Sequence, residues 1–283
     1  MRPITISSRQ LSQRSAFILL VLATIIIVVP VLLILLKIII SGAEAISWEF
    51  LTQAPSQAGK AGGILPAIVG TFYLIFGTLI FALPVGVMAG IYLTEYAPDN
   101  WLTRLINMAI LNLAGVPSIV YGLLGLGIFV LALNFGMSLL SASLTLACQA
   151  LAMTITTSRE AILTVPKEYR DGSLAVGATR WQTIRHIILP QAIPGIVTGA
   201  ILAMSRAAGE TAPILVVGAA FILPKLPQSP LDQFMALPYH LYTTAAHVPG
   251  IPDSTMWGTA LVLLIVVLSF NIIATAIRLR TPR

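Results

Sequence analysis

The stretch DGSLAVGATRWQTIRHIILP, from Asp171 to Pro190, decides how this chain is organised, because it is a polar segment between two long apolar ones. Within the inner segment 158–189 we expect two short amphipathic helices, with flexible points at Gly172 and Gly177, since glycine has the greatest backbone freedom. Proline fits the first turn of a helix, so Pro190 predicts the start of the next apolar helix. If the apolar segments cross a membrane, this segment is typical of an element that docks to a cytoplasmic partner.

The composition excludes an ordinary soluble domain. Only 9% of the 283 residues are charged and 57% are hydrophobic, with a mean hydropathy of +0.94, whereas soluble domains carry about 25% charged residues. This predicts an all-α, polytopic membrane protein in contact with the lipid bilayer. The net charge of +6 does not indicate a nucleic-acid partner, because the basic residues flank apolar runs. The single cysteine excludes an intramolecular disulfide, and the three histidines lack metal-ligand spacing, so we expect no metal site.

Six apolar runs are long enough to cross a bilayer. We predict spans at 15–40, 64–94, 104–133, 138–157, 190–222 and 255–277. The first run has about 26 residues, more than a signal-peptide core, and so predicts an uncleaved span. With both termini in the cytoplasm, the inner segments hold twelve basic residues: Arg2, Arg9, Arg14, Arg104, Arg159, Lys167, Arg170, Arg180, Arg185, Arg278, Arg280 and Arg283. The outer loops hold two or three, which is the expected bias and favours an even number of spans.

The chain divides near residue 63. We expect 1–63 to hold a cytoplasmic tail, the first span and an outer loop, and 64–283 to form a core of five spans that includes the inner loop 158–190. Helix kinks are expected at Pro84, Pro117 and Pro213. The proline-rich outer segment 223–254 is expected to be irregular, with a short helix near 231–242, and is either a surface loop or a contact for something delivered from outside.

The predicted fifth span contains an opposite-charge pair, Arg206 and Glu210. A charge at the bilayer centre costs about 2.5–3.5 kcal/mol on insertion scales. The i, i+4 spacing places both residues on one helix face, although Arg before Glu is the less favourable order. The pair is either a structural salt bridge or the charged wall of a polar pathway, where an arginine fork suits phosphate and Ser205 and Thr211 could add hydroxyl donors.

The spacing within Asp171–Pro190 resembles the cytoplasmic signature loop of ATP-binding-cassette importer permeases. That pattern is Glu-Ala-Ala, three residues, Gly, nine residues, Ile-x-Leu-Pro. Gly177, Ile187, Leu189 and Pro190 are in register, while Asp171, Gly172 and Ser173 replace Glu-Ala-Ala. The resemblance implies that this loop couples the chain to a separate ATPase subunit. The chain has no phosphate-binding loop of its own, because Gly59-Lys60 is followed by alanine.

A second resemblance is narrower. The segments SRAAGETAP (Ser205–Pro213), AGVPSIVYGL (Ala114–Leu123) and GIYLTEYA (Gly90–Ala97) are similar to the permease subunits of bacterial phosphate importers, and the Ala-Pro after Gly-Glu-Thr resembles the A-type subunit. This implies a type I importer permease fold with six transmembrane helices, alternating access for inorganic phosphate, and Arg206 and Glu210 on its path. It implies a non-catalytic subunit of the bacterial inner membrane that binds no cofactor itself.

The same resemblance implies several partners. They are a related C-type permease subunit, two ATPase subunits that bind ATP-Mg, and an extracytoplasmic phosphate-binding protein.

Three alternatives stay open at this point. An importer for another oxyanion, sulfate or molybdate, would lack the Arg-x-x-Gly-Glu-Thr run. An ion-coupled secondary transporter usually shows an internal repeat. A membrane-embedded enzyme would need a His/Asp/Glu or Cys constellation near the membrane surface.

Overall fold

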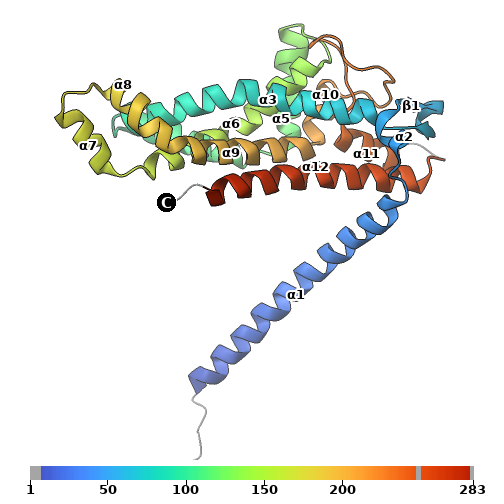
Figure 1. The fold of residues 1–283 in the computed structure, drawn as a ribbon, viewed down its shortest axis with the longest axis horizontal. Helices are drawn as coiled ribbons and strands as arrows, with labels where there is room; N and C mark the ends of the chain where they lie inside the picture. Colours follow the sequence, from blue (N-terminus) through green and yellow to red (C-terminus); the bar gives the residue numbers. More distant parts are fainter. Residues whose placement is uncertain (1–7, 247–249, 281–283) are drawn as a thin grey trace, which may run out of the picture.

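The computed structural model describes residues 8–246 and 250–280, which are mostly helical (Figure 1). The long helices are α1 (Ser8–Ala43), α3 (Leu65–Ile91), α6 (Leu139–Leu163), α9 (Leu189–Gly209) and α12 (Asp253–Arg280). The shorter α-helices are α2 (Trp48–Thr52), α4 (Trp101–Ala114), α5 (Ser118–Gly125), α7 (Lys167–Ala175), α8 (Arg180–Thr183), α10 (Ala212–Val217) and α11 (Leu237–Ala246). The remaining elements are the 3₁₀ turn η1 (Gln57–Gly59), the antiparallel strands β1 (Pro55–Ser56) and β2 (Ala61–Gly62), and the π-helical turns η2 (Tyr92–Tyr96), η3 (Leu126–Ala132) and η4 (Ile184–Ile188).

Helices α3, α6, α9 and α12 lie side by side and form the body of the molecule (Figure 1). Small residues allow their backbones to approach closely, as is usual between membrane helices. A Cβ atom on Gly86 of α3 would lie 2.5 Å from Cγ2 of Thr154 in α6, and one on Gly199 of α9 would lie 2.5 Å from Oγ1 of Thr157. The central position of α6 therefore depends on glycines of its two neighbours.

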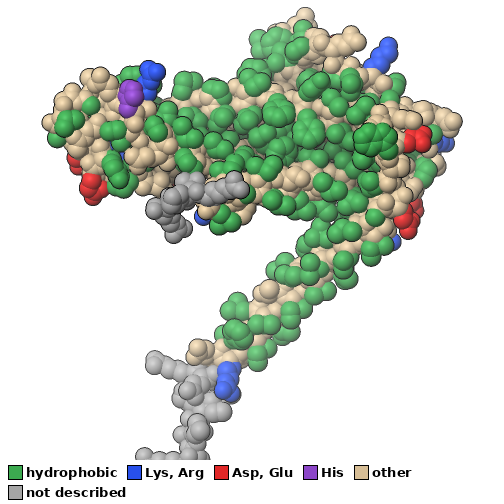
Figure 2. All heavy atoms as spheres, viewed as in Figure 1, with side chains coloured by type: hydrophobic (Ala, Val, Ile, Leu, Met, Phe, Trp, Pro, Cys, Tyr) green, Lys and Arg blue, Asp and Glu red, His purple; other side chains and the backbone are tan. Residues whose placement is uncertain are grey.

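Helix α1 leaves the bundle and contacts it only near its C-terminal end (Figure 1). There the Lys37 ammonium group lies 5.6 Å from the centre of the Trp257 ring. The apolar window of α1 has a mean hydropathy of 3.4 and none of it is buried by the chain. Figure 2 shows apolar side chains over α1 and the middle of the bundle, with charged side chains gathered at the two ends. This distribution fits a bundle whose middle lies in lipid.

The third span, predicted over 104–133 with a kink at Pro117, is broken into two helices. Five described helices are long and apolar enough to cross a membrane, and the pair α4 and α5–η3, bent by 103°, makes a sixth if it is counted as one span. The break lies at Gly115–Pro117, as expected for Pro117. Proline has no N–H for the helix and keeps the residue before it out of the α conformation. Pro84, in contrast, lies inside α3, and the helix continues past it to Ile91.

The fifth span begins earlier and ends earlier than the predicted 190–222. Residues from Arg180 to Gly209 form one continuous membrane helix. Pro190 lies in the first turn of α9, as predicted, but α9 continues directly from α8 and the π turn η4, in which the Leu189 N–H bonds to the Ile184 carbonyl, five residues back. The helix ends at Gly209, and Pro213 lies in the first turn of α10 instead of kinking α9.

The proline-rich outer segment is only partly a surface loop. Its helix, α11, starts at Leu237, later than predicted, and residues 234–237 are buried. The Leu237 N–H donates to Oγ1 of Thr71 in α3 at 2.8 Å. A Cβ on Gly70 would lie 2.0 Å from the Met235 carbonyl oxygen. The segment is therefore built into the end of the bundle opposite α7 and α8 (Figure 1).

Candidate functional site

The charged pair lies where α9 ends and meets α6. The Arg206 Nε donates to Oε1 of Glu210 at 3.3 Å, and Nε2 of Gln149 in α6 donates to the same oxygen at 2.6 Å. Glu210 is the residue at which the helix terminates, with ψ 126°. The carboxylate thus accepts from two helices at once, and the end of α9 is fixed to the middle of α6.

The two charges are not equally buried. The Glu210 side chain is 17% exposed, whereas the Arg206 side chain is 53% exposed. A small pocket beside them is lined by Leu146, Gln149, Ala150, Met153, Ala203, Arg206, Ala207 and Glu210. Only Nε of Arg206 is hydrogen-bonded among the described residues, so its two terminal nitrogens remain available. A planar guanidinium that is held at Nε and has both terminal nitrogens free can donate two parallel hydrogen bonds to an oxyanion.

The two expected hydroxyl donors are placed differently. Ser205 is buried against α12, where its Oγ accepts from Nδ2 of Asn271 at 2.9 Å. This placement does not support a pathway role for Ser205, which ties α9 to α12. Thr211 is half-buried in the two-residue break between α9 and α10, directly after Glu210. It is close in sequence to the charged pair, and a pathway role for Thr211 stays a prediction.

The inner segment folds into two helices that meet at Gly177. This glycine has φ +89°, the left-handed region that favours glycine, and it ends the turn after α7. Gly172, which we expected to be a second flexible point, lies inside α7. Ser173 is buried and its Oγ lies 2.9 Å from Oγ1 of Thr183, which joins α7 to the following helix. Thr179 and Gln182 form a capping box at the start of α8.

The tip of this segment is exposed and largely apolar. Val176 is 86% exposed and Trp181 is 56% exposed, and Asp171 is also exposed. Ile187 and Leu189 are half-buried and Pro190 is exposed, all within the continuous helix that leads to Arg206. A single continuous helix therefore connects the tip to the charged pair.

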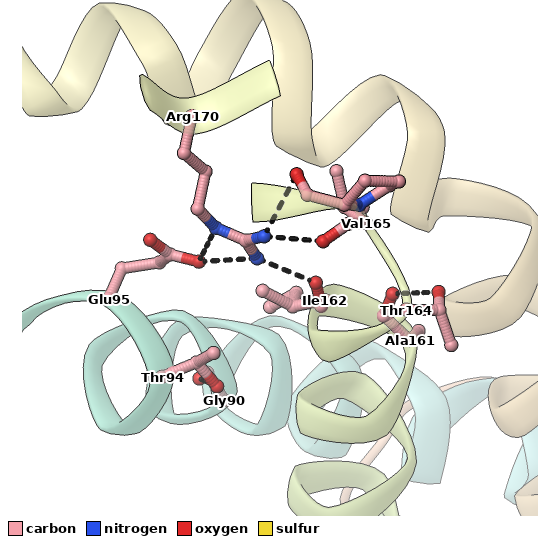
Figure 3. Close-up of polar contacts among 9 residues, drawn as sticks. Gly90, Thr94, Glu95, Ala161, Ile162, Thr164, Val165 and Arg170 are labelled. Atoms are coloured by element: carbon pink, nitrogen blue, oxygen red, sulfur yellow. Dashed lines mark hydrogen bonds and ion pairs between the residues drawn. The ribbon is translucent and has the colours of Figure 1, made fainter. Parts of the chain in front are cut away.

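A largely buried ion pair that the sequence did not predict holds the base of the segment (Figure 3). The Arg170 guanidinium donates from Nε and Nη2 to Oε1 of Glu95, at 3.1 and 2.9 Å, and Nη2 also donates to the Ile162 carbonyl at 2.8 Å. Nη1 donates to the carbonyls of Val165 and Pro166. Glu95 belongs to the π turn that ends α3, so Arg170 joins the ends of α3 and α6 to α7.

A bundle of apolar helices with a half-exposed charged pocket and an exposed helical segment at one end fits a subunit of a membrane transport system. The family described as "binding-protein-dependent transport system inner membrane component" matches residues 82–281, and the chain belongs to this family. It is thus a multi-pass inner-membrane, non-catalytic permease subunit of an ABC transporter, and ATP hydrolysis belongs to a separate subunit.

Curated relatives align over most of the chain. The probable ABC transporter permease protein YqgI of Bacillus subtilis is 36% identical over 84% of this chain and 85% of its own. The phosphate transport system permease protein PstA 1 of Mycobacterium tuberculosis strain H37Rv is 35% identical over 79% of this chain and 72% of its own. The probable phosphate transport system permease protein PstA of Methanocaldococcus jannaschii is 37% identical over 74% and 73%.

Solved structures confirm the fold. A chain of the MetNI methionine ABC transporter in an inward-facing conformation has a TM-score of 0.62 at 20% identity, covering 78% of this chain and 98% of its own. A chain of a bacterial ABC transporter involved in alginate import has a TM-score of 0.60 at 16% identity, covering 95% and 99%. The predicted type I importer permease fold is confirmed.

Sequence reasoning missed three partners of the site: Glu95, Gln149 and Asn271. Arg170 was recognised only as one of the basic residues of the inner segment. Gln149 offered a signal, because a polar amide within an apolar span is costly and usually has a partner in the bundle. Asn271 offered the same signal, because it is an amide within the predicted sixth span. Glu95 offered none, because it lies just past the end of a predicted span and its partner is 75 residues away in the sequence.

Proposed function

We propose that this chain is the A-type permease subunit of an importer for inorganic phosphate. The observation that carries the proposal is the half-exposed Arg206, whose Nε is held by Glu210 while its two terminal nitrogens stay free among the described residues; Gln149 in turn donates to the Glu210 carboxylate. Phosphate offers several oxygens to a bidentate guanidinium. The relatives named as phosphate transport permeases support the same substrate.

Glu210 has two roles in this proposal. It fixes the guanidinium through Nε, and its negative charge lowers the attraction of the site for an anion. The second effect matters because a substrate on a transport path must leave as well as bind. Gln149 shares the carboxylate and holds it in place, at a 2.6 Å distance, as the surrounding helices move.

The proposed partners follow the exposed surfaces. A related C-type permease pairs with this chain and encloses the pathway between the two. Two ATPase subunits, which bind ATP-Mg, receive the tip around Val176 and Trp181, and an extracytoplasmic phosphate-binding protein docks at the opposite end. This orientation places both termini and the segment 158–190 in the cytoplasm, with residues 1–63 outside the permease core.

Alternating access then uses the single helix from Arg180 to Gly209. ATP binding closes the ATPase dimer and displaces the tip at Gly177. The displacement reaches the end of α9, where Arg206 faces the pathway, and opens the spans outward to accept phosphate. Hydrolysis returns the spans to the inward-open state. This chain itself binds no cofactor in the proposed cycle.

The test is phosphate uptake into vesicles that contain the complete transporter, with wild type compared with Arg206→Gln. A hydrogen bond to a charged group is worth about 1.5–3 kcal/mol, so losing the guanidinium is expected to lower uptake at least tenfold while the complex still assembles. Arg104→Gln is the matched control, because Arg104 pairs with Asp99 on the surface with 69% and 81% of the side chains exposed. Unchanged uptake in Arg206→Gln, or transport of sulfate or molybdate in place of phosphate, would overturn the proposal.

A further inference from the structure

A second arginine lies in the same helix as Gln149, nearer the α7 end. Arg159 of α6 donates from Nη1 to Oδ1 of Asn107 in α4 at 2.9 Å. Its Nε is buried and has no hydrogen-bond partner among the described residues. Neither Arg159 nor the neighbouring Glu160 forms an ion pair within the described ranges 8–246 and 250–280. A buried N–H of a charged group without a partner is costly, so this guanidinium has capacity for a further acceptor.

The arginine lines a hollow between α4 and α6. The hollow has a volume of about 190 Å³ and is lined by Asn107, Ile110, Leu111, Ile155, Thr156, Arg159, Glu160 and Leu163. This is ample for several water molecules or a small ion. The amide nitrogen of Asn107 makes no hydrogen bond among the described residues, so a second donor lies beside the guanidinium.

The chemistry of the hollow repeats that of the pocket at Arg206. Each site combines one arginine, one carboxamide and one carboxylate: Arg206, Gln149 and Glu210 in the first, and Arg159, Asn107 and Glu160 in the second. In each, an oxygen acceptor from another position holds one nitrogen of the guanidinium and leaves the others free. The carboxylates differ in place: Glu210 pairs with Arg206, whereas Glu160 lines the hollow without pairing with Arg159.

The two sites lie along one helix. Gln149 and Met153 of the pocket and Thr156 and Glu160 of the hollow recur at i, i+4, i+7 and i+11, so parts of the two linings share a face of α6, while Arg159 lies about 80° around the helix from Gln149. Gln149 and Arg159 are ten residues apart, which is about 15 Å at 1.5 Å per residue. α6 runs from the charged pocket toward α7 (Figure 1), so the Arg159 hollow lies nearer α7 along this helix than the pocket at Arg206 does.

We propose that Arg159 and Asn107 form a second oxyanion site, which takes phosphate after its release from Arg206 and before it enters the cytoplasm. The proposal rests on the proposed function for the direction of travel and the identity of the ion. The site itself is defined by the unpaired guanidinium, the amide donor and the hollow. Two moderate sites in series let an ion advance without a single deep binding step.

A single reporter thiol tests the site directly. The chain has one cysteine, Cys148, so Cys148→Ala combined with Leu163→Cys leaves one thiol on this chain, at the edge of the hollow and away from the proposed donors. The complete transporter is treated with an anionic thiol reagent, with inorganic phosphate or with chloride at equal ionic strength, and labelling of this chain is measured by mass spectrometry. We expect phosphate to slow labelling at least threefold, and we expect Arg159→Gln to abolish this protection while Arg104→Gln retains it.

Transport provides the second measurement. Arg159→Gln is expected to lower the maximal uptake rate at least fivefold, Arg159→Lys is expected to restore part of it, and Arg104→Gln is expected to stay within twofold of wild type. If phosphate does not slow labelling of the single thiol in the reporter variant, the proposed oxyanion site at Arg159 and Asn107 is refuted, even if Arg206→Gln abolishes uptake. If phosphate slows labelling but the wild-type transporter imports none, the inner oxyanion site stands and the proposed function falls.

Discussion

Replacing Arg170 with methionine is expected to destabilise the base of the coupling segment. The change leaves the Glu95 carboxylate, whose side chain is only 14% exposed, without its cation, and it removes the donor to the Ile162 carbonyl. Breaking a buried pair by removing one partner costs about 3–5 kcal/mol. Because both side chains keep some contact with water, we expect about 3 kcal/mol, or roughly 6–12 °C in the unfolding midpoint.

Glu95→Gln is the informative partner of this variant. The amide oxygen still accepts from Arg170, and the arginine keeps its bonds to the backbone carbonyls at the end of α6. We therefore expect a loss of about 1 kcal/mol, clearly smaller than that of Arg170→Met. The double variant Glu95→Gln with Arg170→Met should be more stable than Arg170→Met alone, because no buried carboxylate then lacks a cation.

The assay is thermal unfolding of the complete transporter in detergent, together with the number of ATP molecules hydrolysed per phosphate imported. The number should rise in Arg170→Met, because the ends of α3 and α6 no longer follow α7. Arg104→Met breaks an exposed pair and should change the midpoint by no more than a degree or two. A midpoint shift below about 2 °C in Arg170→Met, or equal losses in Glu95→Gln and Arg170→Met, would refute the reasoning.

Two further predictions concern single residues. Gly177→Val places a β-branched residue at φ +89°, where left-handed backbone costs about 1–2 kcal/mol. We therefore expect normal membrane insertion but more ATP hydrolysed per phosphate imported, and a milder effect in Gly177→Asn. Normal coupling in the valine variant would contradict the docking role of this turn. Burial lowers the pKa of His240, in α11, from 6.5 to about 4. Its contribution to stability is therefore complete above pH 6.5 and is lost as the pH falls toward 4. We expect a loss of about 2 kcal/mol at pH 5 that His240→Gln does not show in thermal unfolding from pH 7.5 to 4.5, and identical pH profiles would refute this.

Much of the fold could be predicted because membrane insertion is decided locally. Each span must carry about 20 apolar residues, whatever its neighbours are, so hydropathy located all six apolar segments, including the bent one. Pro117 marked the break in the third span correctly as a position, but proline chemistry alone does not say whether a helix bends slightly or turns by 103°. α3 continues past Pro84 without a break, whereas the third span turns sharply at Pro117.

The candidate site was predicted in part. Arg206 and Glu210 stood out because charges inside an apolar run are costly and rarely accidental. The sequence could not tell that Ser205 faces α12, because adjacent helix residues differ by about 100° and the neighbour on each side depends on how the bundle packs. The fifth span also ended earlier than predicted, because apolar composition continues past Gly209 although the helix does not.

The sequence by itself determined the class of protein, the location of the spans and the positions of the charges, since these depend on the free energy of placing each residue in lipid or water. Only the tertiary structure decided which polar groups meet. Gln149 reaches Glu210 across 61 residues and Glu95 reaches Arg170 across 75, through contacts between helices that no local pattern specifies. The physical reason is that burial of charge is a local cost, whereas its compensation depends on the packing of distant helices.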